Sequence, residues 1–123
     1  MAGTVTLKVL ATILNGSHSE VFGSSNNITI VQDAIGAHAP VVTVGFAAEE
    51  DMPIGDVSVL GWLFLKNLDS TNFVTYGPKD TTMKAFGRIE PGEYAALRLE
   101  PGITLRWQAD TADVQVKVLL LED

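Results

Sequence analysis

Residues 60–78 decide the expected fold, and they read LGWLFLKNLDSTNFVTYGP. An apolar run at residues 60–65 is followed by a polar segment at 67–72, a second run at 73–76 and the pair Gly77-Pro78. Asn and Asp favour turns because their side chains bond to nearby backbone groups, and Gly-Pro ends a strand. Aromatic residues, which occur in both runs, pack well on a pleated surface. The stretch predicts a hairpin at the centre of a β-sandwich.

The first part of the chain predicts further strands. Residues 4–14 alternate between apolar and polar side chains with the period of a half-buried strand. Asn15-Gly16 is a strong turn dipeptide. Residues 15–27, rich in Ser, Asn and Gly, are predicted to form an extended loop or a short edge strand. Strands are expected at residues 27–32 and 41–46, and one helical turn at 47–51.

Two Pro-Gly turns organise the end of the chain. Glu90-Pro91-Gly92 and Glu100-Pro101-Gly102 suit type II turns, because proline presets its own φ and glycine accepts the positive φ that follows. They bracket a short strand at residues 94–99, and further strands are predicted at 83–89, 103–109 and 114–121. The sequence therefore predicts an all-β protein of eight or nine strands. We expect an antiparallel, jelly-roll-like β-sandwich forming a single domain, residues 1–123.

The composition excludes several classes of function. The 123 residues include no cysteine, which rules out disulfides, thiolate nucleophiles and sulfur-ligated metals. Fifteen acidic residues against eight Lys and Arg give a net charge of −7, which disfavours nucleic acid as a partner. Neither a signal peptide nor a membrane-spanning run is recognised, so we expect no membrane partner and synthesis in a cytoplasm.

Residues capable of catalysis are few and dispersed. His18 and His38 each lie in a loop-like segment without identifiable partners, although a general base needs positioned neighbours. The acidic run at residues 49–51 could help bind calcium, but its spacing fits no known loop, and a solvated loop is the better interpretation. Arg98 and Arg106 are expected on neighbouring strands, where they pair with acidic residues or meet an acidic partner. We therefore predict no enzyme activity, no cofactor and no metal site.

Three segments carry a resemblance to known proteins. They are residues 60–74 (LGWLFLKNLDSTNFV), 86–93 (FGRIEPGE) and 108–123 (QADTADVQVKVLLLED). The chain resembles a group of small proteins that tailed bacteriophages encode near their head and virion-structure genes. The resemblance implies a virion component, and we favour a capsid decoration (cement) protein. Such proteins are often all-β and trimeric, and they bridge major capsid protein subunits on the outer shell.

This hypothesis names partners and contact residues. The expected partners are the major capsid protein and further copies of the chain in a trimer on the capsid surface, after synthesis in the host cytoplasm. The candidate capsid contacts are Thr4, Thr6, His18, Glu20, Phe22 and Asn26. The candidate trimer interface consists of Trp62, Phe64, Phe73 and Tyr76, whose alternative place is the domain's own core.

Other functions remain open at this point. A tail or baseplate adaptor, or a fibre-associated β-domain, would also be small and oligomeric. A carbohydrate-binding jelly roll would use exposed aromatic residues, with Trp62 and Trp107 as candidates. A cupin-like enzyme would need clustered metal ligands, for which two isolated histidines do not suffice.

Overall fold

The computed structural model describes residues 3–32 and 36–123. Strands make up most of these residues, with turns, bends and irregular connections between them. No helix occurs among the described residues, and every strand pair is antiparallel. This part of the chain thus contains no helical segment of the length and apolar character needed to cross a membrane. The chain divides into two compact units, Met1–Ile35 and Gly36–Asp123. One domain over residues 1–123 stays a prediction, and each unit is described by itself.

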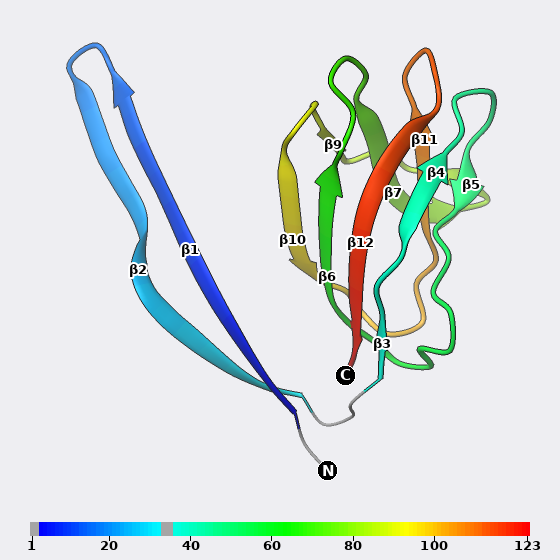
Figure 1. The fold of residues 1–123 in the computed structure, drawn as a ribbon, viewed down its shortest axis with the longest axis horizontal. Coiled ribbons are helices and arrows are strands. Elements are labelled where there is room, and N and C mark those ends of the chain that lie inside the picture. The colour runs from blue at the N-terminus through cyan, green and yellow to red at the C-terminus, as the bar shows by residue number, and fades with distance from the viewer. Residues whose placement is uncertain (1–2, 33–35) are drawn as a thin grey trace. The chain divides into compact units, whose positions relative to one another are not determined.

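The first unit is a long β-hairpin, here termed the arm (residues 3–32). Strand β1 (Gly3–Asn15) pairs with β2 (His18–Gln32) from one end to the other (Figure 1). The turn predicted at Asn15-Gly16 is confirmed, and Gly16, with φ of 60°, occupies the first central position, as a type II′ turn requires. Of the two alternatives predicted for residues 15–27, the extended loop is wrong, because most of this segment belongs to a strand, β2, which is longer than the short edge strand of the other alternative.

An irregularity within β2 accounts for its loop-like composition. The register changes between the pairs Leu7–Ile28 and Val9–Ser24, so that Lys8 alone lies opposite residues 25–27. The backbone N–H of Asn26 donates to Oγ of Ser24 at 3.0 Å. Ser and Asn commonly bond to nearby backbone in this way. These residues therefore form a bulge inside a strand rather than a loop between strands.

Gly23→Ala is expected to disrupt pairing in the distal half of the arm. Gly23 has φ of 89°, and a Cβ atom there would lie 2.0 Å from the carbonyl oxygen of Val9. The left-handed conformation alone costs an L-residue about 1–2 kcal/mol, and the clash adds to this. Amide hydrogen exchange along β1 should show faster exchange near Leu10. Gly16→Ala is the control, since it also has positive φ but meets nothing within 4 Å; equal exchange in both variants would contradict the steric argument.

The second unit, here termed the body (residues 36–123), contains two five-stranded sheets. In the first sheet the order is β10-β6-β12-β3, and β4 also pairs with β12. Its strands are β3 (Ala37–His38), β4 (Val41–Val44), β6 (Leu60–Asn67), β10 (Tyr94–Arg98) and β12 (Val114–Glu122). In the second sheet the order is β5-β11-β7-β8, and β9 also pairs with β7. Its strands are β5 (Glu50–Asp51), β7 (Val74–Asp80), β8 (Thr82–Met83), β9 (Gly87–Ile89) and β11 (Leu105–Ala109).

Some predictions for the body need correction. The described residues hold more strands than the eight or nine predicted. The strands of the predicted central hairpin, β6 and β7, belong to different sheets, so residues 68–73 connect the two sheets. The helical turn predicted for residues 47–51 is also wrong, because Glu50–Asp51 form β5, which pairs with β11. An extended pair with β11 is available there, and it outweighs the weak helical preference of a five-residue segment.

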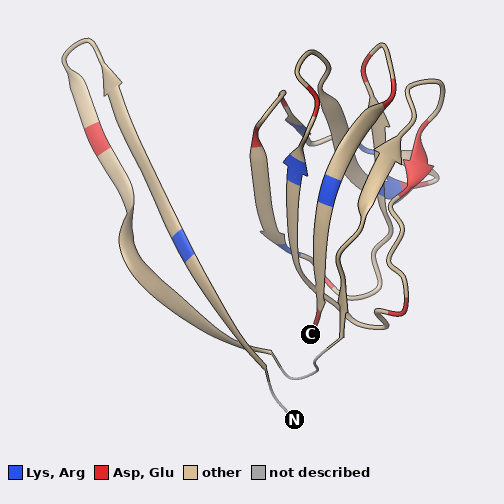
Figure 2. Cartoon of the chain, viewed as in Figure 1, with Lys and Arg blue, Asp and Glu red and all other residues tan. Residues whose placement is uncertain are grey.

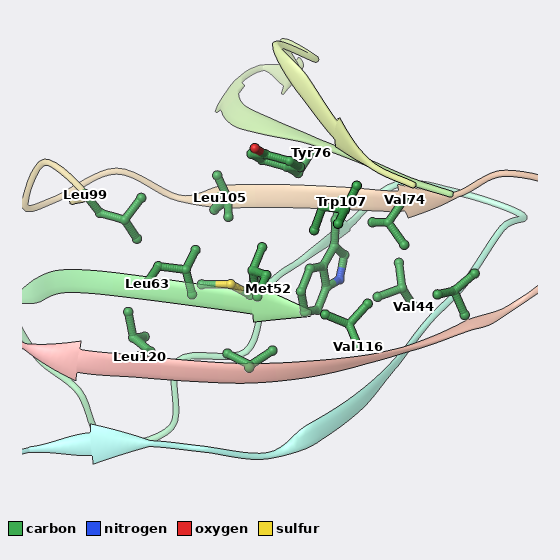
Figure 3. Packing of buried hydrophobic residues seen from close by; sticks show 14 of the residues in the cluster. Val44, Met52, Leu63, Val74, Tyr76, Leu99, Leu105, Trp107, Val116 and Leu120 are labelled. Atoms are coloured by element: carbon green, nitrogen blue, oxygen red, sulfur yellow. The ribbon is translucent and has the colours of Figure 1, made fainter. Parts of the chain in front are cut away.

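Side chains from both sheets meet in one hydrophobic core. Leu63 and Leu120 of the first sheet point toward Leu105 and Trp107 of the second (Figure 3). Trp107, which is 1% exposed, is the largest of the fully buried side chains. Along β6 and β12 buried residues alternate with more exposed ones, as expected for strands with one face on a core.

Candidate binding surfaces

The arm has one apolar face. Residues directly opposite each other in an antiparallel pair carry their side chains on the same face. Alternate residues of β1 and their partners on β2 thus form a surface termed the apolar face: Val5, Leu7, Val9, Ala11, Ile13, Phe22, Ile28 and Ile30. Phe22 is 67% and Ile28 52% exposed. Val9, Phe22 and Ile28 also line one shallow hollow, together with residues of the bulge.

The opposite side of the arm is mixed in character. It carries several threonines and Lys8 beside exposed Leu10, Leu14, Val21 and Val31. Lys8 and Glu20 are the only Lys, Arg, Asp or Glu residues among the described residues of the arm (Figure 2). The body, by contrast, has 13 acidic against 7 basic residues, a formal charge of −6. The arm is therefore suited to contacts that depend on apolar burial rather than on charge.

The six candidate capsid contacts all lie on the arm and all are exposed. They do not share one face. Thr4 and Thr6 lie on the mixed side, Phe22 and Glu20 lie on the side of the apolar face, and Asn26 lies in the bulge. Nε2 of His18 lies 3.3 Å from Oε2 of Glu20 near the turn. Their role as capsid contacts stays a prediction.

The four candidate interface aromatics are divided by the fold. Trp62 and Phe64 alternate with core residues of β6, so they lie on the outer face of the first sheet. Their rings stack with centroids 5.9 Å apart, and Phe64 lies opposite Leu119 of β12. Nε1 of Trp62 is buried and has no hydrogen-bond partner among the described residues. We term Trp62, Phe64 and Leu119 the aromatic face.

The other two aromatics lie elsewhere. Tyr76 of β7 is 7% exposed and belongs to the core, the alternative that the sequence left open for it, and burial raises the pKa of its phenol. Phe73 lies in the connection before β7, with the guanidinium of Arg88 4.5 Å from its ring centroid. Trp107 is likewise a core residue, which removes it from any exposed sugar-binding platform.

The two arginines noted in the sequence are paired with acids, as predicted, although they are not on neighbouring strands. Arg98 of β10 lies 2.7 Å from the carboxylate of Asp123. Nε of Arg106 lies 2.6 Å from Oδ1 of Asp51, its cross-strand partner, and Nη1 lies 2.7 Å from Oε1 of Glu49. The backbone N–H of Met83 also donates to Glu49, and this bond, with that from Arg106, lowers the pKa of the Glu49 carboxyl.

The acidic run at residues 49–51 is thus engaged in structure. Glu49 and Asp51 bind Arg106, and Glu50 accepts a hydrogen bond from the backbone N–H of Gly45 at 2.8 Å. In residues 3–32 and 36–123, no group of three or more acidic or histidine side chains is arranged to hold a metal ion. The calcium alternative therefore gains no support from the geometry of this run.

Glu49→Gln is expected to remove a pH-dependent part of the stability. Because the folded-state pKa of Glu49 lies below the ordinary value of about 4.5 for this carboxyl, the carboxylate stabilises the fold above pH 4.5. This contribution is lost as the pH falls through the folded-state pKa. Unfolding free energies of the two proteins, measured in urea at several pH values, should therefore differ above pH 4.5 and converge below it. A difference that stayed constant with pH would contradict this assignment.

One larger hollow occurs in the body. It has a volume of about 630 Å³ and is lined mainly by apolar residues, among them Phe86, Leu97 and Ile103. Lys84, Arg98 and Glu100 also line it. Arg98 is paired with Asp123, and neither histidine is among the lining residues.

Comparison with protein families, with characterised proteins and with solved structures finds no match for this chain. The surfaces described above and the resemblance stated from the sequence are therefore the basis for a functional proposal.

Proposed function

We propose that this chain is a virion structural protein that acts by binding rather than by catalysis, and specifically a capsid decoration protein. On this proposal it binds the outer shell and bridges major capsid protein subunits. The observation that carries the proposal is the arm, a paired hairpin of thirty residues that forms a compact unit of its own. A two-stranded hairpin by itself is at best marginally stable in water. The arm therefore gains stability when a partner covers it.

The dimensions of the arm suit a bridging role. Thirteen residues of β1 extend about 43 Å at about 3.3 Å per residue. On this proposal the length of the arm is what lets one copy contact more than one subunit of a shell. Many copies on one shell, each held by several contacts, would rebind at high effective concentration when one contact opened. Binding through many weak contacts needs neither a cofactor nor a catalytic group.

We also propose a jelly-roll β-sandwich for the body, and the strand order supports it. With β3 and β4 counted as one strand and the short β8 left aside, eight strands remain. The first sheet then has the order first, last, third, sixth, and the second sheet has the order second, seventh, fourth, fifth. This order is the one produced when an eight-stranded ribbon wraps into two sheets as paired Greek keys. Jelly rolls are a common framework of viral capsid proteins, which agrees with the proposed role.

The proposal is tested by co-sedimentation with phage heads. Purified protein is mixed with expanded empty heads of a phage that carries this sequence, and in parallel with its purified tails. We expect the protein to pellet with heads and to raise the temperature at which they break, since a ligand that binds only the assembled shell stabilises it. Protein that stays in the supernatant with heads would overturn the proposal. Protein that pellets with tails alone would identify a tail or baseplate adaptor instead.

A further inference from the structure

The apolar face of the arm requires an occupant. Its eight apolar side chains follow the arm from the Val5–Ile30 pair to Ile13 near the turn. The strand pair is about 43 Å long and about 10 Å wide, which gives one face a projected area of roughly 400 Å². This projection, to which the relief of the side chains adds, is about half of the ~800 Å² that each partner buries in a stable interface. In the free protein, an exposed apolar patch of this size would promote aggregation.

The charge of the arm indicates the chemistry of that occupant. One Lys and one Glu among residues 3–32 leave the arm formally neutral, while the body carries −6. Glu20 lies at the turn end of the apolar face, opposite Ile13 and 3.3 Å from His18, and Lys8 lies on the other side. A neutral apolar surface gains little from a strongly charged partner surface, since burying unpaired charge is costly. The occupant must therefore be neutral, apolar and about as long as the arm. The arm of a second copy has each of these properties.

The relief of the face is also self-complementary. Phe22, which is 67% exposed, lines the shallow hollow together with Val9, Ser24 and Ile28. Across the strand pair from Phe22 lies Ala11, the smallest side chain of the face. A twofold operation can thus set the Phe22 ring of each copy over the low area of the other. Such an isologous contact closes on itself and does not propagate into fibres.

We propose that the apolar face of the arm is covered by the same face of a second copy of this chain, so that arms form the interface between copies. This inference rests on the proposed function in one respect: the mixed side and the turn of the arm stay free to contact the shell. Two faces in contact would lie about 10 Å apart, as stacked sheets do. The aromatic face of the body is the competing surface for self-association.

Oligomeric state in solution tests this inference with matched variants of the full chain. Phe22→Ser removes an exposed apolar side chain from the apolar face, and Val21→Ser removes one of similar exposure, 61% against 67%, from the opposite side. Leu119→Ser removes an apolar side chain that is 36% exposed from the aromatic face. Light scattering over a dilution series should show an oligomer for the parent chain, at least tenfold weaker association for Phe22→Ser, and no change for the other two.

Other results would overturn the inference. A monomeric parent chain, equal weakening by Phe22→Ser and Val21→Ser, or dissociation by Leu119→Ser alone would each do so. Near-UV circular dichroism of the body aromatics, unchanged in all variants, verifies that the body remains folded. The head-binding assay separates this inference from the proposed function. If the protein is a monomer that still pellets with heads, only the arm-to-arm contact is contradicted. If it is an arm-mediated oligomer that does not bind heads, only the capsid role is contradicted.

Discussion

Trp107→Ala is expected to destabilise the body by about 3–5 kcal/mol, the usual cost of truncating a large buried aromatic residue. Trp107 is 1% exposed and lies in the core where side chains of both sheets meet (Figure 3). Its removal leaves a cavity that the surrounding strands can fill only in part. Because small domains are stable by about 5–15 kcal/mol, the variant should be partly or wholly unfolded at ambient temperature. Urea unfolding followed by far-ultraviolet circular dichroism measures the loss.

Tyr94→Ala provides the matched control for this prediction. Tyr94 is also an aromatic residue on a strand, but it is 74% exposed and its ring contacts the ammonium of Lys66 at 4.9 Å. Exposed cation–π contacts contribute about 0.5–1 kcal/mol, so this variant should unfold close to the parent chain. Similar losses in the two variants would mean that Trp107 is not the centre of the core.

Asn67→Ala is expected to cost about 3 kcal/mol or more, although it removes few atoms. Asn67 is fully buried at the end of β6. Its Nδ2 donates to the backbone carbonyls of Asn72 and Ile89, each at 2.9 Å, and its Oδ1 accepts from the N–H of Asp69 at 2.8 Å. Each buried backbone group that loses its partner costs about 1–3 kcal/mol. The side chain thus joins the first sheet to β9 of the second and shapes the connection between them.

Two measurements separate this role from a general packing effect. Gln115→Ala also removes an amide, but one that is exposed and bonded to Oγ1 of Thr43 alone, and it should change stability by no more than about 0.5 kcal/mol. In Asn67→Ala the N–H of Asp69 should exchange with solvent faster than in the parent chain, by a larger factor than the N–H groups of core residues. Protection of this N–H equal to that in the parent chain would rule out the proposed bond.

Local patterns in the sequence predicted much of the body. The Pro-Gly turns are confirmed: Gly92 and Gly102 have φ of 79° and 89°, and the N–H of Glu93 donates to the carbonyl of Glu90. The strand predicted at residues 114–121 is also confirmed, because the alternation of apolar and polar side chains can be read directly from the sequence. Sheet membership was predicted less well. The polar segment after Asn67 is compatible with a hairpin turn or with a crossing between sheets, and the buried bonds of Asn67 decide between them.

The candidate surfaces were predictable only in part. The alternation at residues 4–14 indicated an apolar side. The register between β1 and β2, however, depends on the bulge opposite Lys8, and the composition of the bulge is typical of a loop. The register shift was therefore not predicted from the sequence. Gly23, which lies next to the bulge and has positive φ, is the residue whose type could have indicated it. For the aromatic residues, strand period places Trp62 and Phe64 on the same side of their strand, but it does not say whether that side faces the core, because both sides of the run at residues 60–65 are apolar. The same holds for Tyr76, because which face of β7 is covered depends on the second sheet as a whole.

The place of β12 in the first sheet has a consequence for biosynthesis. β12 pairs with β3, β4 and β6, which the ribosome completes about fifty or more residues before it reaches β12. Contacts so distant in sequence form slowly, whereas the arm pairs neighbouring residues and can form as soon as it emerges. Nascent chains on one messenger RNA would therefore display finished arms while their bodies are still incomplete. Assembly between copies can then begin during translation, before the body has folded.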